Sequence, residues 1–246
     1  GEAIPCPDRP RVRREIDAGG ARSRAQFPRR GCRDLSPVPD SPRTKSRSHR
    51  RGSPELEPED TSKDDAAFWL YSSGTTGFPK GAIHLHHDMM VEADYYAKDT
   101  IGIKESDTSF SIAKLFFAYG LGNGLYFPLR TGGTTVLLPD RPLPQTIFET
   151  VDKFKPTVYY GVPTSYAALL NMAEKTDRTD FGNVRMCISA GEPLPKPIYD
   201  KWKERFGLEI YDGIGSTEIL HIFISNRPGR VKPGSTGEIV EGYEAR

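Results

Sequence analysis

The sequence predicts an α/β fold in which a largely parallel sheet is covered by helices. From residue 55 onward, short apolar runs alternate with longer segments whose apolar residues recur at helical spacing. Strands that alternate with helices in this way are typical of parallel sheets, because each helix carries the chain back to begin the next strand. Residues 55–246 are also long enough to enclose one substantial core.

The first predicted elements are a strand, a loop, a second strand and a helix. Residues 66–71 form a short apolar run rich in aromatic side chains, which predicts a buried strand before a Ser/Gly-rich loop. Ile83 and Leu85 continue as a second strand. A helix is expected over residues 87–98, because Asp88 suits a helix N-terminus and an apolar pattern follows.

The later elements alternate regularly. Runs rich in β-branched or aromatic residues predict strands at residues 134–138, 157–161 and 184–189. Between or after them, apolar residues three and four apart predict helices at residues 144–154, 164–173 and 196–206. No internal repeat is present.

The formal net charge of +1 is the sum of two unlike pieces. Residues 1–54 hold 14 basic and 6 acidic residues, whereas residues 55–246 hold 20 basic and 27 acidic residues. The first piece is rich in arginine and proline and has few large apolar side chains, so it cannot offset its chain entropy by burial. We expect residues 1–54 to be a disordered or artefactual leader; a basic arm that binds nucleic acid is the alternative.

Composition excludes several classes of protein. The three cysteines have no metal-like spacing, so neither a disulfide framework nor a zinc site is indicated, and a cytoplasmic setting fits them. The longest apolar stretch, residues 115–129, is broken by glycines and a proline and is shorter than the roughly 20 residues that cross a bilayer. We therefore expect no membrane span, and no secretory signal.

A group of histidines gives a superficial metal signal. His84, His86 and His87 stand beside Asp88. They are better explained as alternate positions on a strand followed by the start of a helix, since no second set of ligands follows.

The most informative segment is residues 71–81, Tyr-Ser-Ser-Gly-Thr-Thr-Gly-Phe-Pro-Lys-Gly. Its glycines let backbone amides approach phosphate oxygens, its hydroxyls add donors, and Lys80 supplies a compact positive charge. It is not a Walker loop, which requires Gly-Lys-Ser/Thr where this chain has Pro79-Lys80-Gly81. A flexible turn is the alternative, but a turn would not need a buried strand before it.

This segment resembles the phosphate-loop signature of the adenylate-forming superfamily, which includes acyl-CoA synthetases, peptide-synthetase adenylation domains and luciferases. Two further segments match in the expected order, residues 189–195 (Ser-Ala-Gly-Glu-Pro-Leu-Pro) and 211–218 (Tyr-Asp-Gly-Ile-Gly-Ser-Thr-Glu). The resemblance implies the large N-terminal domain of that family, with ATP, Mg²⁺ and CoA. A carboxylate would attack the α-phosphate of ATP to give an acyl-adenylate and pyrophosphate, and positioned charge must offset the repulsion between these anions.

The resemblance also implies residue roles. Lys80, Thr217 and Glu218 would act in catalysis, with Lys80 at the β- and γ-phosphates, Thr217 at the α-phosphate and Glu218 at Mg²⁺. The nucleotide would be held by Ser72, Ser73, Gly74, Thr75, Thr76, Gly77, Lys80, Ala190, Gly191, Glu192, Pro193, Asp212, Gly213, Ile214 and Thr217.

Residues 114–123 and 212–226 look like the benzoate-CoA ligase branch. Phe117 stands where relatives often carry a gating aromatic residue or histidine, and an apolar slot with a few polar groups suits a flat aryl acid. Core packing is the alternative for Phe116, Phe117 and Tyr119, and we favour it for Phe116. The residues placed around the aromatic ring are Phe117, Ala118, Tyr119, Gly215, His221 and Ile222.

The expected function is an AMP-forming aryl-acid:CoA ligase acting on benzoate or 4-hydroxybenzoate. A 2-aminobenzoate or other substituted-benzoate ligase is the alternative, because a methyl-sized change in a pocket alters binding by only about 1–3 kcal/mol. Ser216, where the aminobenzoate branch tends to have alanine, favours benzoate. The partners expected are small molecules, with no membrane or nucleic acid, and a homodimer in the intact protein.

The likeness is partial in two respects. Residues 1–54 bear no resemblance to the front of the family's N-terminal domain, and the usual Pro-Val-Pro-Gly-Tyr after residues 234–237 is replaced by residues 238–243, Glu-Ile-Val-Glu-Gly-Tyr. We expect this chain to lack the family's ribose-binding Asp, its hinge and its C-terminal domain with the catalytic Lys. We expect residues 55–246 to be the central part of the AMP-binding domain and the chain to have little or no ligase activity as it stands.

Overall fold

A computed structural model describes residues 58–72 and 78–244. The described residues from 62 onward belong to one compact unit, and residues 58–61 belong to a second. Of the second unit only residues 58–61 are described, as exposed chain without regular structure. The expected leader, residues 1–54, lies outside the described residues.

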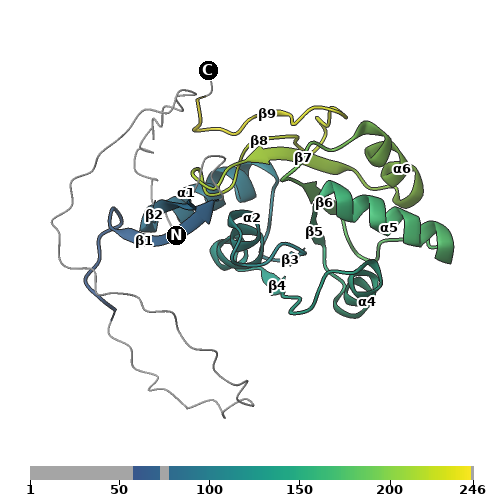
Figure 1. Ribbon diagram of the computed structural model, residues 1–246, viewed down its shortest axis with the longest axis horizontal. Coiled ribbons are helices and arrows are strands. Elements are labelled where there is room, and N and C mark those ends of the chain that lie inside the picture. Colours follow the sequence, from purple (N-terminus) through teal and green to yellow (C-terminus); the bar gives the residue numbers. More distant parts are fainter. Residues whose placement is uncertain (1–57, 73–77, 245–246) are drawn as a thin grey trace, which may run out of the picture. The chain divides into compact units, whose positions relative to one another are not determined.

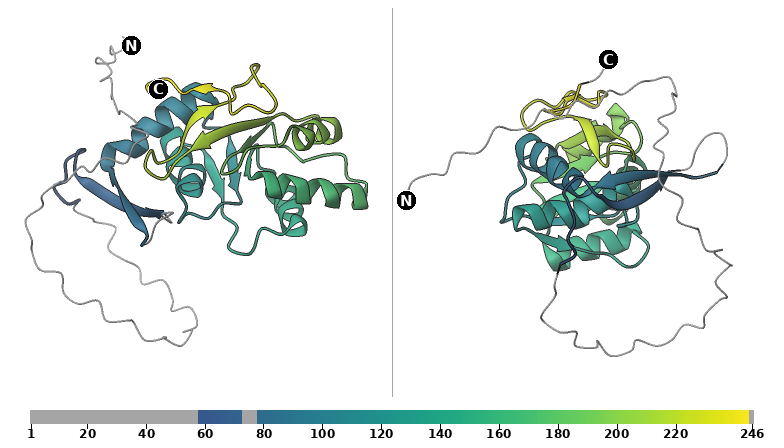
Figure 2. Two further views of the ribbon diagram at one scale, coloured as in Figure 1. Left: turned by 45° about the horizontal axis from the view of Figure 1, so that its top comes forward. Right: turned by 90° about the vertical axis from the view of Figure 1, so that its left-hand side faces the viewer.

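The described strands form two sheets (Figure 1). β1 (Ala66–Ser72) and β2 (Lys80–Leu85) pair antiparallel as a hairpin apart from the larger sheet, as Figure 2 shows. The larger sheet has seven strands in the order β4-β3-β5-β6-β7-β8-β9, of which the first five are parallel and the last two antiparallel. Its strands are β3 (Thr108–Ser111), β4 (Thr134–Val136), β5 (Val158–Gly161), β6 (Met186–Ser189), β7 (Ile210–Gly215), β8 (Ile222–Ser225) and β9 (Glu238–Ile239).

Helices cover both faces of the parallel strands. Successive side chains of a strand point to opposite faces, and β5 accordingly sends Val158 and Tyr160 into one core and Tyr159 into the other. One face is covered by α1 (His86–Glu92), the π-helix η1 (Ala93–Thr100), α2 (Ala118–Leu121), the π-helix η2 (Gly122–Tyr126) and α3 (Phe127–Thr131). The other is covered by α4 (Pro144–Phe154), α5 (Pro163–Thr176) and α6 (Lys196–Phe206), which Figure 1 shows gathered beside β5 and β6.

The predicted fold class and elements are largely confirmed. The strands expected at residues 134–138, 157–161 and 184–189 correspond to β4, β5 and β6, and three expected helices correspond to α4, α5 and α6. The helix expected over residues 87–98 exists, but its second half is the π-helix η1. The sequence did not predict β3, the segment from α2 to α3, or β7 to β9 as regular elements.

One structural expectation is wrong: β1 is not a buried strand. Leu70 on β1 and His84 on β2 face the interior, but Trp69 is 56% exposed and Tyr71 is 73% exposed on the opposite face. The reason is that β1 pairs only with β2 in a two-stranded sheet, and one face of that sheet remains uncovered among the described residues. An apolar run shows that side chains can be buried, not how many faces of the strand are covered.

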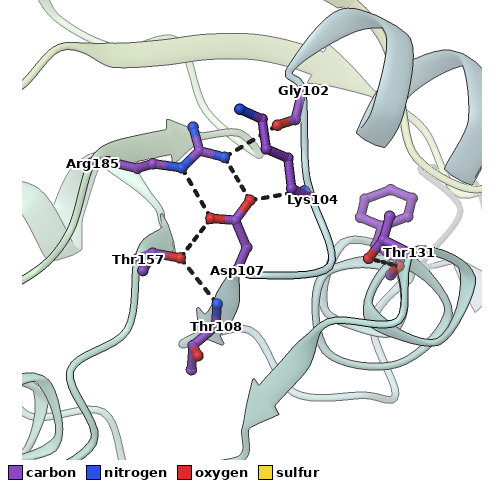
Figure 3. Close-up of polar contacts among 8 residues, drawn as sticks. Gly102, Lys104, Asp107, Thr108, Thr131, Thr157 and Arg185 are labelled. Atoms are coloured by element: carbon purple, nitrogen blue, oxygen red, sulfur yellow. Dashed lines mark hydrogen bonds and ion pairs between the residues drawn. The ribbon is translucent and has the colours of Figure 1, made fainter.

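Charged and hydroxyl side chains join three parallel strands at their N-terminal ends, as Figure 3 shows. Asp107 precedes β3, Thr157 precedes β5 and Arg185 precedes β6. Arg185 donates from Nε to Asp107 Oδ1 (2.9 Å) and from Nη2 to Oδ2 (2.6 Å). Thr157 Oγ1 donates to Oδ1 (2.7 Å), and the backbone N–H of Lys104 donates to Oδ2 (2.9 Å). This Asp107 clamp fixes the strand ends opposite those that carry the candidate site.

No helix within residues 58–72 and 78–244 is long and apolar enough to cross a membrane.

Candidate functional site

The site lies at the C-terminal ends of the parallel strands. β4 lies on one side of β3 and β5 on the other, so the chain changes direction across the sheet between β3 and β5. In open α/β sheets, ligands bind outside the carboxyl ends of strands at such a point. Tyr119 of α2 lies there, because its hydroxyl donates to the carbonyl of Gly161 at the end of β5 (3.2 Å) and to that of Ile188 in β6 (3.3 Å).

Two of the sequence motifs meet beside this point. Ser189, the last residue of β6, pairs with Asp212 of β7. The backbone N–H of Leu194 donates to Asp212 Oδ2 (3.3 Å), which ties the loop after β6 to β7. That loop carries the predicted nucleotide residues 190–193, of which Ala190 is buried, while Gly191 has a φ of 94° that favours glycine. The structure therefore brings these residues next to Asp212, Gly213 and Ile214.

Asp212 is a buried carboxyl group with an altered titration. Burial raises the pKa of Asp212 to about 6, although the hydrogen bond from the backbone N–H of Leu194 favours its charged form. The side chain therefore resists ionisation until the pH approaches neutrality.

Asp212→Asn should stabilise the chain above about pH 6 by about 3 kcal/mol, because one pKa unit corresponds to about 1.4 kcal/mol and the shift is about two units. The folded-state pKa of about 6 lies above the unfolded value of about 3.9. Folding therefore favours the protonated acid, and wild-type stability from this group falls as the pH rises through that window. Urea unfolding of both proteins across the window measures the effect. A difference between them that does not vary with pH would contradict it.

The turn between β7 and β8 carries Thr217 and Glu218. The carbonyl oxygen of Thr217 accepts a hydrogen bond from the backbone N–H of Leu220 (3.2 Å), and the backbone N–H of Ser216 donates to the carbonyl of His221 (3.3 Å). Leu220 is fully buried and has a φ of 82°, which is strained for a bulky side chain. Glu218 is exposed in this turn and does not begin a helix, because the chain returns directly into β8.

The phosphate-loop segment is described only at its two ends. Ser72 ends β1 and lies opposite Lys80, the exposed first residue of β2. The predicted residues Ser73, Gly74, Thr75, Thr76 and Gly77 lie outside the described residues.

Some of the predicted aryl residues belong to a cluster around the buried side chain of His221. Nε2 of His221 lies 3.0 Å from Asn123 Oδ1 and 3.2 Å from the carbonyl oxygen of Tyr119. Both are acceptors, so Nε2 carries the hydrogen. Burial lowers the pKa of His221 to about 3, and the ring is neutral at physiological pH. The rings of Tyr119 and Phe127 lie 5.4 Å and 4.6 Å from it.

The remaining predicted aryl residues lie at different distances from this cluster. Ala118 precedes Tyr119 at the start of α2, and Gly215 pairs with Ile222 across β7 and β8. Phe117 is 57% exposed, just before α2. The expectation that Phe116 packs in the core is wrong: it is 72% exposed, in the connection between β3 and α2.

Two residues of the cluster were not predicted as site residues. Asn123 is fully buried and joins His221 to Ser111, to which its Nδ2 donates (3.3 Å). The ring of Tyr96 lies 5.2 Å from that of His221. The signal for Asn123 was a single polar residue in a glycine-rich apolar run, whereas nothing in the helical pattern distinguishes Tyr96.

The histidine group lies near the same turn. His84 is buried with Nε2 2.9 Å from the carbonyl oxygen of Thr217, while His87 Nδ1 lies 3.0 Å from Asp64 Oδ1. Asp88 accepts a hydrogen bond from the backbone N–H of Leu85 (3.0 Å), as expected at a helix N-terminus. Within the described ranges, no three His, Cys, Asp or Glu side chains are grouped to hold a metal ion.

Comparison with known proteins gives consistent matches. A family model of AMP-binding enzymes matches residues 14–246. The benzoate–CoA ligase of Thauera aromatica is 51% identical over 195 residues, which are 79% of this chain and 37% of that protein. The 4-hydroxybenzoate–CoA/benzoate–CoA ligase of Rhodopseudomonas palustris is 46% identical over 189 residues, 77% of this chain and 35% of that protein.

A solved structure agrees with these relatives. The anthranilate CoA ligase AuaEII, crystallised in complex with anthranoyl-AMP, superimposes with a TM-score of 0.74 and 44% identity over 77% of this chain and 37% of that one. The chain therefore spans little more than a third of the length of the proteins it matches. Its sequence match, its fold and the meeting of its motifs at one sheet edge show that the chain belongs to the AMP-binding enzyme family.

Proposed function

We propose that this chain provides the ATP- and acid-binding part of an AMP-forming aryl-acid:CoA ligase that acts on benzoate or 4-hydroxybenzoate. The observation that carries the proposal is that one hairpin, β7 to β8, holds both halves of the chemistry. The turn of this hairpin bears Thr217 and Glu218, and two residues predicted at the aromatic ring, Gly215 and His221, stand on either side of the turn. An acid bound in the cluster would present its carboxylate to the α-phosphate at Thr217.

The residues around His221 would suit a flat, uncharged ring. His221 is neutral, and Ala118, Tyr119 and Ile222 supply apolar and aromatic surface around it. Phe117, at the exposed start of α2, would close over the ring. Ser216 and the higher identity to benzoate ligases favour benzoate or 4-hydroxybenzoate over 2-aminobenzoate.

The nucleotide would lie across the ends of β6 and β7 with its triphosphate towards the β1–β2 hairpin. Residues 190–193 and 212–214 would hold the adenosine, and residues 72–77 with Lys80 would hold the β- and γ-phosphates. Mg²⁺, held partly by Glu218, would offset the negative charge of the phosphates. The carboxylate oxygen bonds to the α-phosphorus as the bond to pyrophosphate breaks, and CoA sulfur later replaces AMP on the acyl carbon.

Binding of stable aryl-adenylate analogues tests this function on the chain itself. Calorimetry with N-benzoyl, N-(4-hydroxybenzoyl), N-(2-aminobenzoyl) and N-octanoyl sulfamoyl adenosine would compare the acids. We expect one of the first two to bind most tightly and the octanoyl compound to bind at least about tenfold more weakly. Equal binding of the alkyl and aryl compounds, or none by any, would contradict the proposal.

Lys80→Met should weaken Mg²⁺·ATP binding by about 10- to 100-fold, since a charge-assisted hydrogen bond contributes about 1.5–3 kcal/mol. The benzoyl analogue lacks β- and γ-phosphates, so its affinity should not change. Lys201→Met, at an exposed position of α6, is the matched control and should affect neither ligand. A Lys80 variant that loses both ligands equally would show that Lys80 does not act on the distal phosphates.

A further inference from the structure

His84 links two parts of the molecule that are distant in sequence. It lies on β2, and its Nε2 is 2.9 Å from the carbonyl oxygen of Thr217, 133 residues later. Because a carbonyl only accepts, Nε2 must carry the hydrogen. The side chain is fully buried, so water does not compete for this bond.

The His84 ring is packed among its neighbours, and its Nδ1 makes no hydrogen bond with any described residue. The ring of Phe68 packs against it, with centroids 5.2 Å apart. Its Nδ1 lies 3.5 Å from Asp88 Oδ2. Asp88 is in turn held by the backbone N–H of Leu85 (3.0 Å) and lies 3.3 Å from His87 Nε2. The Nε2–H of His84 therefore points at Thr217 before any ligand binds.

The partner of His84 is a turn under strain. Leu220 has a positive φ, and the bond from its N–H to the Thr217 carbonyl is 3.2 Å long, longer than the bond from His84. Backbone strain persists where surrounding contacts hold it. The bond from His84 is such a contact, and it acts on the residue adjacent to Glu218.

His84 and Lys80 are on the same face of β2, because side chains four residues apart in a strand point the same way. They are separated by about 13 Å along the strand. The face of β2 that presents Lys80 at the start of the strand therefore also contacts the Thr217 turn, through His84, near the end of the strand. A triphosphate that reaches from Thr217 to Lys80 requires a constant spacing between these two groups.

We propose that His84 is a positioning residue of this site: its Nε2–H holds the main chain of Thr217 so that the Thr217–Glu218 turn and Lys80 keep a constant spacing. The expected effect of His84 on ATP binding rests on the proposed function. The hydrogen bond by which His84 holds the main chain of Thr217 does not depend on that function. His84 touches no reacting atom in this arrangement and acts through Thr217.

Three substitutions separate the hydrogen bond from packing. His84→Gln places an amide N–H near the position of Nε2 and should behave like the wild type. His84→Phe keeps a ring but has no donor, and His84→Asn keeps a polar side chain that is too short to reach Thr217. Ile83→Gln alters the exposed face of the same strand and is the control.

Amide hydrogen exchange in the 246-residue chain without ligand measures directly how strongly His84 stabilises the Thr217 turn. Amides of residues 216–221 should exchange about tenfold faster in the Phe and Asn variants, the change expected for loss of one hydrogen bond, and at the wild-type rate in the Gln and Ile83 variants. Peptides of α5 should not change in any of them, which shows that the variants are folded. Unchanged exchange in both the Phe and Asn variants, or equal acceleration in the Gln variant, would overturn the proposal.

Mg²⁺·ATP affinity supplies the second measurement. The Phe and Asn variants should bind about tenfold more weakly and the Gln variant within about twofold of the wild type. If the turn loosens but affinity stays constant, His84 does not position the site. If the wild type binds no Mg²⁺·ATP while the turn still loosens, the proposed function fails and the hold of His84 on Thr217 stands.

Discussion

Asp107→Ala should lower the free energy of unfolding by about 3 kcal/mol, because it leaves several donors of the Asp107 clamp without an acceptor at a buried position. Asp107 is 4% exposed and accepts hydrogen bonds from Arg185, Thr157 and the backbone of Lys104. Thr157 also accepts from the backbone N–H of Thr108 (3.0 Å), so the loss should spread to the start of β3. Urea unfolding measures the change.

Asp94→Ala is a matched control for the clamp. Asp94 also accepts two hydrogen bonds from one arginine, Arg130 (3.0 Å and 2.9 Å), but the two side chains are 35% and 40% exposed. A solvated ion pair contributes roughly 0–1 kcal/mol, so this substitution should cost much less. Equal losses in the two variants would show that burial of Asp107 is not what makes its clamp important.

The clamp also has a characteristic pH dependence. Burial by itself would raise the pKa of Asp107, but hydrogen bonds from Arg185, Thr157 and Lys104 outweigh it and hold the pKa below its usual value. A depressed folded-state pKa stabilises the fold above the unfolded value of about 3.9, and this contribution is lost as the pH falls below it. The deficit of Asp107→Ala should therefore shrink in acid, opposite in sign to the effect expected at Asp212.

The sequence predicted strands best where both faces of the strand are buried. β5 and β6 are buried on both faces and read as continuous apolar runs, so both were found. β3 pairs with a strand on each side, β4 and β5, yet its sequence Thr-Ser-Phe-Ser has one apolar residue and gave no strand signal. β1 has a strong apolar pattern and one open face. The composition of a strand thus indicates which side chains can be buried, but it does not indicate which elements will cover each face of the strand.

The helical segment that contributes residues to the aryl cluster was not predicted, because it is rich in glycine. The region from α2 to η2 contains Gly120, Gly122 and Gly124, which lower helix propensity. At Gly122 an added Cβ would lie 2.6 Å from Cδ2 of His221 and 2.8 Å from the hydroxyl of Tyr126. The same residue that weakens the helical signal is needed for His221 to pack against the helix, so the packing could not be read from propensity.

The sequence motifs were predicted more completely than the long-range contacts between them and the rest of the molecule. The segments after β6 and within β7 were expected to serve one nucleotide, and the pairing of Ser189 with Asp212 places them together. The link from His84 to Thr217 was not foreseen, because it joins residues 133 positions apart and neither residue type signals the other. Periodicity reports local structure, whereas a contact of this range depends on how the hairpin packs.

Gly215→Ala should reduce binding of the benzoyl-adenylate analogue by about 10- to 100-fold, since leaving a buried polar group without its hydrogen bond costs about 1–3 kcal/mol. A Cβ at Gly215 would lie 2.4 Å from the carbonyl oxygen of His221 and 2.8 Å from its carbonyl carbon. These are backbone atoms of the paired strand and cannot rotate away. The β7–β8 turn must open, which breaks the Ser216–His221 bond and moves His221 from Asn123.

Gly207→Ala distinguishes this effect from the general cost of replacing glycine. Gly207 ends α6 with a φ of 69°, and nothing lies within 4 Å of an added Cβ. Alanine there should cost about 1 kcal/mol of stability through backbone strain and leave the analogue's affinity unchanged. Calorimetry, with circular dichroism to confirm that both variants are folded, makes the comparison. A folded Gly215 variant that binds the analogue as the wild type does would mean that the spacing of β7 and β8 does not shape the aryl site.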